Sequence, residues 1–154
     1  MTEFDSTALH RILVAVDGSE NAGRAVQFAI ELARHFGSEV TVLSVYKHTS
    51  HMESCLSLVR TRQVPAPPDE VMHDLAQEAV DWAAERFTEA GVEGVETMIR
   101  RGPPARTIVQ TAKKNDADAI VLGTRGLGDV EGFFLGSVSH KVNALADCTC
   151  ITVR

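Results

Sequence analysis

The 154-residue sequence has few cysteines, no long apolar run and no concentrated positive charge. Three cysteines, an odd and small number, favour reduced thiols and a cytoplasmic location. Apolar runs such as residues 12–16 are far shorter than the roughly 20 residues of a membrane-spanning helix, and no secretory signal is visible. The net charge of −6 and the lack of a basic patch argue against nucleic acid and anionic membranes as partners.

The sequence does have a globular composition, with 44% hydrophobic residues, and alternating strand and helix patterns. Ser19 is expected to cap the first helix and Gly37 to end it, and Asp69 is expected to cap the second helix. The inner side of that second helix is expected to carry Met72, Leu75, Ala76, Ala79, Trp82 and Ala83, with Trp82 in the core. The expected strands are residues 12–16, 40–45, 95–100, 119–122 and 150–153, and the expected helices are residues 20–36, 70–90, 104–114 and 137–146.

This alternation predicts a single α/β domain over residues 1–154. We expect an open, doubly wound, five-stranded parallel sheet in the order 3-2-1-4-5, with helices on both faces. Such sheets bind ligands outside the carboxyl ends of their strands, where the winding direction reverses, so the turns after the first and fourth strands would line one crevice. Residues 46–68 form either a lid or a short-helix insertion, and the sequence does not decide between the two.

The turn after the fourth strand holds the residues with the clearest chemical role. It reads Gly123-Thr124-Arg125-Gly126 and, after nine more residues, Gly136-Ser137-Val138-Ser139. Gly123 would let a ligand approach the backbone, Gly126 would allow a positive φ, and Gly136 would open a helix whose free amides suit phosphate. Side chains that can bind phosphate oxygens are also present: Arg125, Ser137 and Ser139. Each glycine alone is more often a turn residue, but three in this register favour a phosphate site.

Other chemical signatures do not occur in the sequence. There is no Gly-x4-Gly-Lys-Ser/Thr loop, no Gly-x-Gly-x-x-Gly fingerprint, and neither the His-x-Gly-His nor the Ser-Gly-Gly signature of adenylyl-transfer enzymes. No Ser-His-Asp set is suggested, and His48, His51 and Cys55 match no zinc site that can be completed. The sequence therefore indicates a nucleotide site without an obvious general base.

The spacing Gly-x2-Gly-x9-Gly-Ser, after Val16-Asp17-Gly18-Ser19 at the end of the first strand, resembles the universal stress protein family in its ATP-binding branch. The resemblance covers residues 11–154 and implies the adenine-nucleotide α-hydrolase-like fold. It also implies that Asp17 lies beside the ribose or a bound Mg²⁺, and that the backbone of Val45 reads adenine. The implied base and ribose walls are Ala15, Val16, Leu122 and Gly123, and the implied phosphate positions are Gly126, Gly136, Ser137, Val138 and Ser139.

Two features depart from the pattern of that family. Asp129 and Glu131 place negative charge in a loop where the family often has basic residues, which weakens phosphate binding unless Mg²⁺ intervenes or the side chains point away. Prolines that are common around the cysteine before the last strand are missing from residues 146–150.

We therefore expect an ATP-binding stress-response regulator or sensor that hydrolyses ATP slowly at most, with Asp17 as the candidate ligand for Mg²⁺. Two alternatives remain open: a true ATPase or phosphoryl- or adenylyl-transfer enzyme, and a dimeric interaction module that holds no nucleotide. The last strand, from Cys150 to Val153, would be a β-branched edge, which favours pairing with another chain. The family commonly dimerises through this strand, so the resemblance implies a homodimer.

Overall fold

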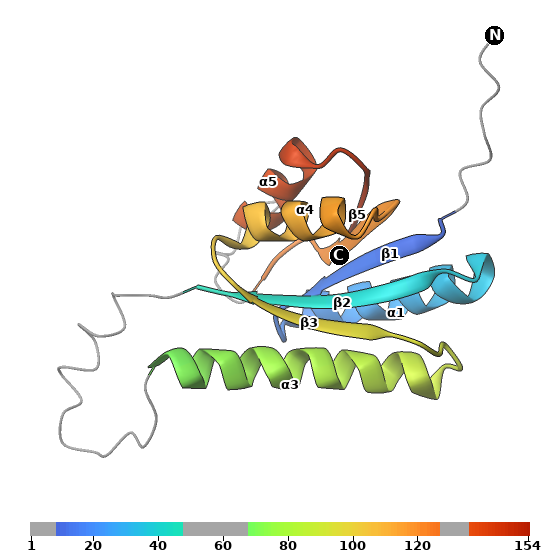
Figure 1. Ribbon diagram of the computed structural model, residues 1–154, viewed down its shortest axis with the longest axis horizontal. Coiled ribbons are helices and arrows are strands. Elements are labelled where there is room, and N and C mark those ends of the chain that lie inside the picture. Colours follow the sequence, from blue (N-terminus) through green and yellow to red (C-terminus); the bar gives the residue numbers. More distant parts are fainter. Residues whose placement is uncertain (1–8, 48–67, 127–135) are drawn as a thin grey trace, which may run out of the picture.

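The computed structural model describes residues 9–47, 68–126 and 136–154. Its sheet has five parallel strands in the order β3-β2-β1-β4-β5, which confirms the predicted fold class (Figure 1). The strands are β1 (Arg11–Val16), β2 (Glu39–Tyr46), β3 (Glu96–Arg101), β4 (Ala119–Gly123) and β5 (Thr149–Val153).

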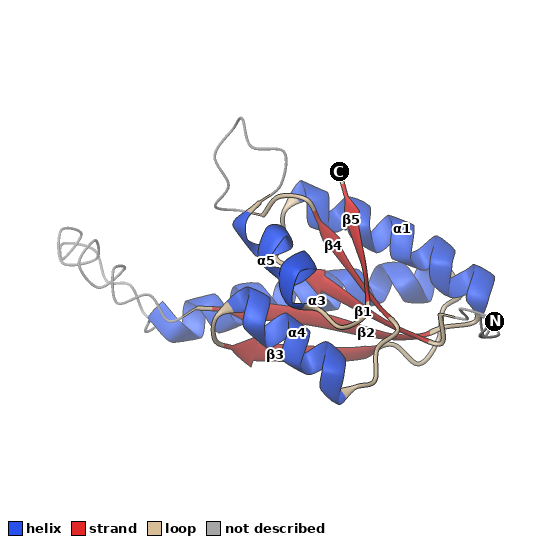
Figure 2. Cartoon of the chain, turned by 90° about the horizontal axis from the view of Figure 1, so that it is seen from above, coloured by secondary structure: helices blue, strands red, loops and turns tan. Residues whose placement is uncertain are grey.

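Helices cover both faces of this sheet. Helices α1 (Glu20–Phe36) and α3 (Pro68–Glu89) lie against one face, and α4 (Pro104–Lys114) and α5 (Ser137–Leu145) lie against the other (Figures 1 and 2). The predicted insertion at residues 46–68 is described only at its ends: Tyr46 closes β2 and Pro68 opens α3. Its interior, with His48, His51 and Cys55, lies outside the described residues, as do Asp129 and Glu131.

Alternation along the central strand divides the core into two halves. In β1, Ile12 and Val14 pack with α1 and α3, whereas Leu13 between them packs with α4 and α5. All three side chains are at most 1% exposed, so each stabilises the fold by roughly 1.5–3 kcal/mol relative to solvent exposure. Because both faces of β1 are covered, its sequence reads as a continuous apolar run rather than an alternating one.

The local signals at the ends of α1 act as predicted. The backbone N–H of Ala22 donates to Ser19 Oγ at 3.2 Å, which satisfies one of the free amides at the start of the helix. Gly37 closes the helix with φ 67° and donates its N–H to the carbonyl of Ala33. The prediction for the start of the second helix was wrong by two positions: α3 begins at Pro68, so Asp69 lies in its first turn rather than at its cap.

Trp82 is not a core residue, contrary to the prediction from helical spacing. Its side chain is 42% exposed, and its ring lies over α1, where a Cβ built on Gly23 would be 3.4 Å from Trp82 Cη2. The guanidinium of Arg86 lies 5.5 Å from the ring centroid, in the range of a cation–π contact. Of the residues predicted on the inner side of α3, Ala76, Ala79 and Ala83 are buried, as are Val80 and Phe87, whereas Leu75 is exposed.

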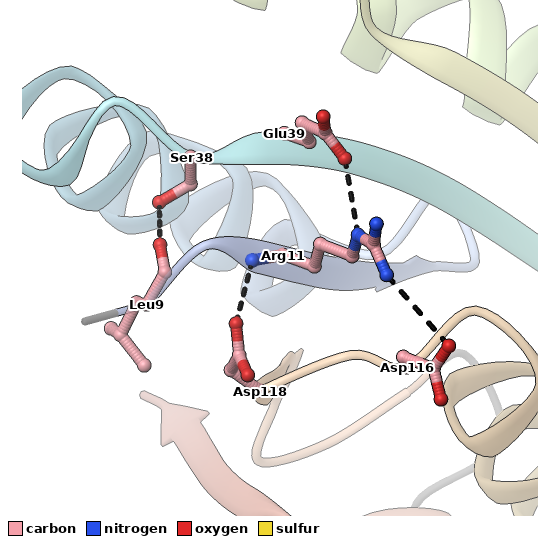
Figure 3. A network of polar contacts seen from close by, with 6 residues as sticks. All are labelled: Leu9, Arg11, Ser38, Glu39, Asp116 and Asp118. Atoms are coloured by element: carbon pink, nitrogen blue, oxygen red, sulfur yellow. Dashed lines mark hydrogen bonds and ion pairs between the residues drawn. The ribbon is translucent and has the colours of Figure 1, made fainter. Parts of the chain in front are cut away.

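The amino ends of the strands are joined by a polar network around Arg11 (Figure 3). Arg11 Nε contacts Glu39 Oε2 at 3.2 Å, and its Nη1 lies 3.7 Å from Asp116 Oδ2. The backbone N–H of Arg11 donates to Asp118 Oδ2 at 2.8 Å, and the Ser38 hydroxyl donates to the carbonyl of Leu9. These contacts tie β1 to the segments that enter β2 and β4.

Among the described helices, none combines the length and the apolar character that crossing a membrane would require.

Candidate functional site

A cavity of about 520 Å³ lies outside the carboxyl ends of β1, β2 and β4. The early turns of α3 and the first turns of α4 and α5 complete its walls, so it lies at the topological switch point of the sheet. Every predicted site residue except Gly136 lines it: Ala15, Val16, Asp17, Val45, Leu122, Gly123, Arg125, Gly126, Ser137, Val138 and Ser139.

The turn after β1 is built around Asp17 and Ser19. Gly18 has φ 79°, a conformation that a residue with a side chain rarely adopts. This turn allows the N–H of Ser19 to donate to Asp17 Oδ1 at 3.0 Å. The Ser19 hydroxyl lies 3.4 Å from the carbonyl oxygen of Arg125, so the turn after β1 contacts the loop after β4.

Gly123 at the end of β4 and Gly126 just after it have packing roles that were not predicted. A Cβ on Gly123 would lie 2.8 Å from the backbone C of Asn21 and 3.0 Å from the N of Ala22. Gly123 thus permits close approach of α1, and it also lines the cavity. Gly126 does not have a positive φ; a Cβ there would instead lie 2.5 Å from Asp17 Oδ2. The glycine leaves room for the Asp17 carboxylate.

The start of α5 is held by the carbonyl oxygen of Thr124. This oxygen accepts the N–H of Gly136 at 2.6 Å and the hydroxyl of Ser139 at 2.7 Å. The prediction that the Gly136 amide and the Ser139 hydroxyl point to phosphate was therefore wrong for this structure: both donate within the protein. Thr124 itself is anchored by its N–H, which donates to the carbonyl of Val153 at 2.7 Å.

The amino terminus of α5 still faces the cavity through Ser137 and Val138. The amides of a first helical turn have no carbonyl partner within the helix, and the helix dipole adds partial positive charge there. Arg125 lines the same end of the cavity and contributes a full positive charge. This end is therefore suited to an anion.

The other end of the cavity is lined mainly by apolar residues, and most of these were not among the predicted site residues. Its walls include side chains of α3 and α4 together with the end of β2: Leu43, Tyr46, Met72, Leu75, Ala76, Pro104 and Ile108. Met72, Leu75 and Ala76 were assigned to the inner side of a helix, but periodicity alone cannot separate a core face from a cavity wall. Lys47 lies at this end as a second cation.

Cys148 and Cys150 lie outside the cavity and pack on the α4–α5 half of the core. Burial raises the pKa of both thiols, and the carboxylates of Asp147 and Asp118 add to the increase at Cys148. Both thiols are free, in agreement with the reduced thiols expected from the small, odd number of cysteines. Raised pKa values disfavour a nucleophilic thiolate.

The doubly wound parallel sheet with a cavity at its switch point defines an α/β protein with a candidate site for a small ligand. The sequence profile of the universal stress protein family matches residues 8–154. Universal stress protein YxiE of Bacillus subtilis (strain 168) is 33% identical over 151 residues, covering 94% of this chain and 99% of that protein. The chain therefore belongs to the universal stress protein family.

Solved structures agree with this assignment. A universal stress protein in complex with cAMP has a TM-score of 0.70 and 26% identity, with 96% of this chain and 98% of that chain covered. The universal stress protein from Archaeoglobus fulgidus in complex with dAMP has a TM-score of 0.66 and 27% identity, with coverage of 96% and 99%. Some structural neighbours of the chain thus bind adenine nucleotides.

Proposed function

We propose that the cavity binds an adenine nucleotide, ATP in particular, and that the protein acts in the cytoplasm as a stress-response sensor or regulator. The observation that carries the proposal is the division of one cavity into an apolar end and an end suited to an anion. The volume of about 520 Å³ is within the range of small-molecule sites. The adenine-nucleotide complexes of the two neighbouring proteins support the same ligand class.

The apolar end suits the base. Leu43, Met72 and Ile108 offer aliphatic surface from three different elements, and Val45 lies where β2 ends. A flat aromatic base gains by leaving water for such a slot, and backbone groups at a strand end can supply polar contacts to its edge. Ala15 and Leu122, on the neighbouring strands, complete the floor.

The opposite end suits the phosphates. Ser137 and Val138 present the amino terminus of α5, and Arg125 adds a flexible guanidinium that can bind two phosphate oxygens together. Gly126 also lines this end of the cavity. Thr124 fixes the helix start through its two hydrogen bonds, so these groups would be in place before a ligand arrives.

Asp17 fits a role with Mg²⁺. It is the only carboxylate among the described residues that line the cavity, and the described residues contain no group of three metal-ligating side chains. Mg²⁺ commonly keeps several waters and takes most of its other ligands from phosphates, so one carboxylate is enough. When bound, the metal would neutralise part of the phosphate charge, and Asp17 would hold it.

We further propose that hydrolysis is slow. No histidine and no second carboxylate line the described part of the cavity, so a separate general base for activating water is missing there. We expect turnover of Mg-ATP below about 0.1 per second, against a median enzyme rate of about 10 per second. Ten or more turnovers per second, abolished by Asp17→Asn, would favour a true ATPase instead.

Calorimetric titration with ATP and with adenosine tests the binding proposal. The wild type should bind both, and Arg125→Gln should weaken ATP by about fivefold or more while leaving adenosine unchanged, because only ATP carries phosphate. Arg106→Gln is the matched control, since Arg106 is exposed on α4 and does not line the cavity. If neither ligand binds at millimolar concentration, the interaction-module alternative replaces this proposal.

We also propose that the protein forms a homodimer through β5. This strand is at the edge of the sheet and pairs with β4, as expected, while Ile151 and Val153 are only partly buried. An edge strand presents backbone groups that a second chain can pair with. Light scattering should give a dimer, and Ile151→Pro should yield monomer or insoluble protein, whereas Thr97→Pro on the opposite edge strand should leave the dimer intact. A wild type that stays monomeric at high concentration contradicts the proposal.

A further inference from the structure

The first two turns of α3 are attached to the sheet differently from the rest of that helix. From Ala76 onward, α3 buries a continuous stripe of side chains that ends at Phe87. None of the described side chains at residues 69–75 is buried, and Leu75 is 53% exposed. Among the described residues, the start of α3 is therefore held by less core packing than the rest of the helix.

Two side-chain contacts join these turns to the ends of β2 and β3. Arg101, the last residue of β3, places Nη1 2.9 Å from Oδ2 of Asp69 in the first turn of α3. Tyr46, the last residue of β2, makes an edge-to-face contact with His73, with ring centroids 6.0 Å apart and an interplanar angle of 85°. Tyr46 and Arg101 are register partners, and the carbonyl of Tyr46 accepts the N–H of Gly102 at 3.0 Å. Both contacts thus start from one fixed point of the sheet.

The same turns of α3 form a wall of the cavity. Met72, Leu75 and Ala76 line it, together with Tyr46, whereas Asp69, His73 and Arg101 do not. Any shift of the helix start would therefore move apolar wall residues without removing a group that touches the ligand.

We propose that Asp69, Arg101 and His73 are positioning residues that hold the start of α3 as the wall of the nucleoside end of the cavity. This inference rests on the proposed nucleotide site. The Arg101–Asp69 and Tyr46–His73 contacts would then raise affinity for the base and sugar by holding the wall in place. This effect differs from any attraction between Arg101 and phosphate.

The choice of ligand distinguishes position from charge. Adenosine carries no phosphate, so loss of a distant cation should not affect it, whereas displacement of the cavity wall should weaken adenosine and ATP equally. Arg100 provides a matched control: it is exposed, neighbours Arg101, and its described contacts are to the Ile99 carbonyl and to the Met98 sulfur.

The experiment measures adenosine and ATP affinity for Arg101→Gln, Arg101→Lys, Arg100→Gln and the double variant Arg101→Gln/His73→Ala. Arg101→Gln should raise both dissociation constants by about two- to fivefold, the range expected for a partly exposed ion pair. Arg101→Lys should restore most of the affinity, Arg100→Gln should leave adenosine unchanged, and the double variant should lose more than Arg101→Gln alone.

Hydrogen exchange on the free protein reports on the contacts without any ligand. Arg101→Gln should speed exchange at residues 70–75 and leave residues 79–87 unchanged, because only the start of α3 depends on the pair. Unchanged exchange at residues 70–75, or faster exchange with unchanged adenosine affinity, would overturn the inference. A wild type that binds neither ligand would refute the proposed function instead, and the two failures are therefore distinguishable.

Discussion

The amino ends and the carboxyl ends of the parallel strands form two opposite sides of the sheet, called here the amino edge and the carboxyl edge. Each carries cavities of similar size, but their linings differ. At the amino edge, two hollows of about 470 and 610 Å³ share Arg11, Gly37 and Glu39; the smaller is lined by charged and polar residues, and the larger also by apolar residues such as Ile12 and Val40. At the carboxyl edge, the cavity of about 520 Å³ combines aliphatic walls with a helix amino terminus. Volume does not distinguish the two edges, so the difference between them must lie in the chemistry of the lining residues.

At the amino edge the charges bind one another. Arg11 contacts both Glu39 and Asp116, and its backbone N–H is accepted by Asp118 (Figure 3). A cation with acidic partners on both sides has little left for an external anion. We therefore propose that the residues of the amino edge stabilise the fold and that those of the carboxyl edge bind the ligand.

The largest expected effect is on stability, at the glycine where the carboxyl edge meets α1. Gly123→Val should lower the free energy of unfolding by about 3 kcal/mol, since its Cβ would lie 2.8 Å from the backbone of Asn21 in a packed interface. Urea denaturation measures the loss. Gly94→Ala is the control: Gly94 has φ 70° but nothing within 4 Å of a built Cβ, so it should cost only about 1 kcal/mol. Equal losses would mean that close packing at Gly123 is not the cause.

The next effect separates binding from stability at the start of α5. Ser137→Asp places an anion at the first position of the helix, where the dipole favours it, so stability should be unchanged or slightly higher. The same charge would repel phosphate, and we expect ATP affinity to fall by about thirtyfold, or about 2 kcal/mol. Adenosine affinity should change less than threefold. Calorimetry with both ligands checks this. An unchanged ATP affinity would mean that the phosphates do not bind at the start of α5.

A smaller effect is expected at the amino edge. Arg11→Gln removes two partly exposed ion pairs while keeping the backbone contact to Asp118, and should cost about 0.5–1 kcal/mol of stability. The loss should shrink in high salt, since such pairs are screened. ATP affinity should not change, in contrast to Arg125→Gln at the other edge. Weaker ATP binding in Arg11→Gln would show that the two edges are coupled.

Much of the fold could be predicted because its signals are local. A continuous apolar run at residues 12–16, a capping Ser19 and a closing Gly37 each act over a few residues, and strand–helix alternation leaves few topologies. The prediction for Trp82 was wrong because helical spacing identifies an apolar stripe but not which residues lie at its centre. In α3 the buried stripe is centred on Val80 and Ala83. Trp82 is instead partly exposed, with its ring close to Gly23 of α1.

The candidate site was predictable where a motif marks it, and less so where only packing does. The glycine spacing led to Ser137 and Arg125, which do line the cavity. It could not give the reason for Gly123, because the approach of Asn21 depends on how α1 crosses the sheet. Nor could it show that the carbonyl oxygen of Thr124 accepts the N–H of Gly136. Met72 and Leu75 carry no motif at all; they became wall residues because α3 starts beside the end of β2.

The smallest expected effect concerns the pKa of Cys148, which the negative charges of Asp147 and Asp118 help to raise. Burial is the main cause of its raised pKa, and Asp147 and Asp118 contribute less, so Asp147→Asn should lower the pKa only slightly and leave it above the usual value of 9.0. Alkylation rate against pH, followed in a Cys55→Ala/Cys150→Ala background, measures the shift.

The raised pKa of Cys148 also fixes the sign of a stability effect. A thiol whose pKa is higher in the folded state stays protonated there while the unfolded chain ionises, so its contribution to stability is lost as the pH rises above about 9. Cys148→Ala should therefore show a shallower fall in unfolding free energy between pH 8.5 and pH 10.5 than the same background with Cys148 present. A steeper fall would mean that the folded state favours the thiolate, contrary to the direction in which burial shifts its pKa.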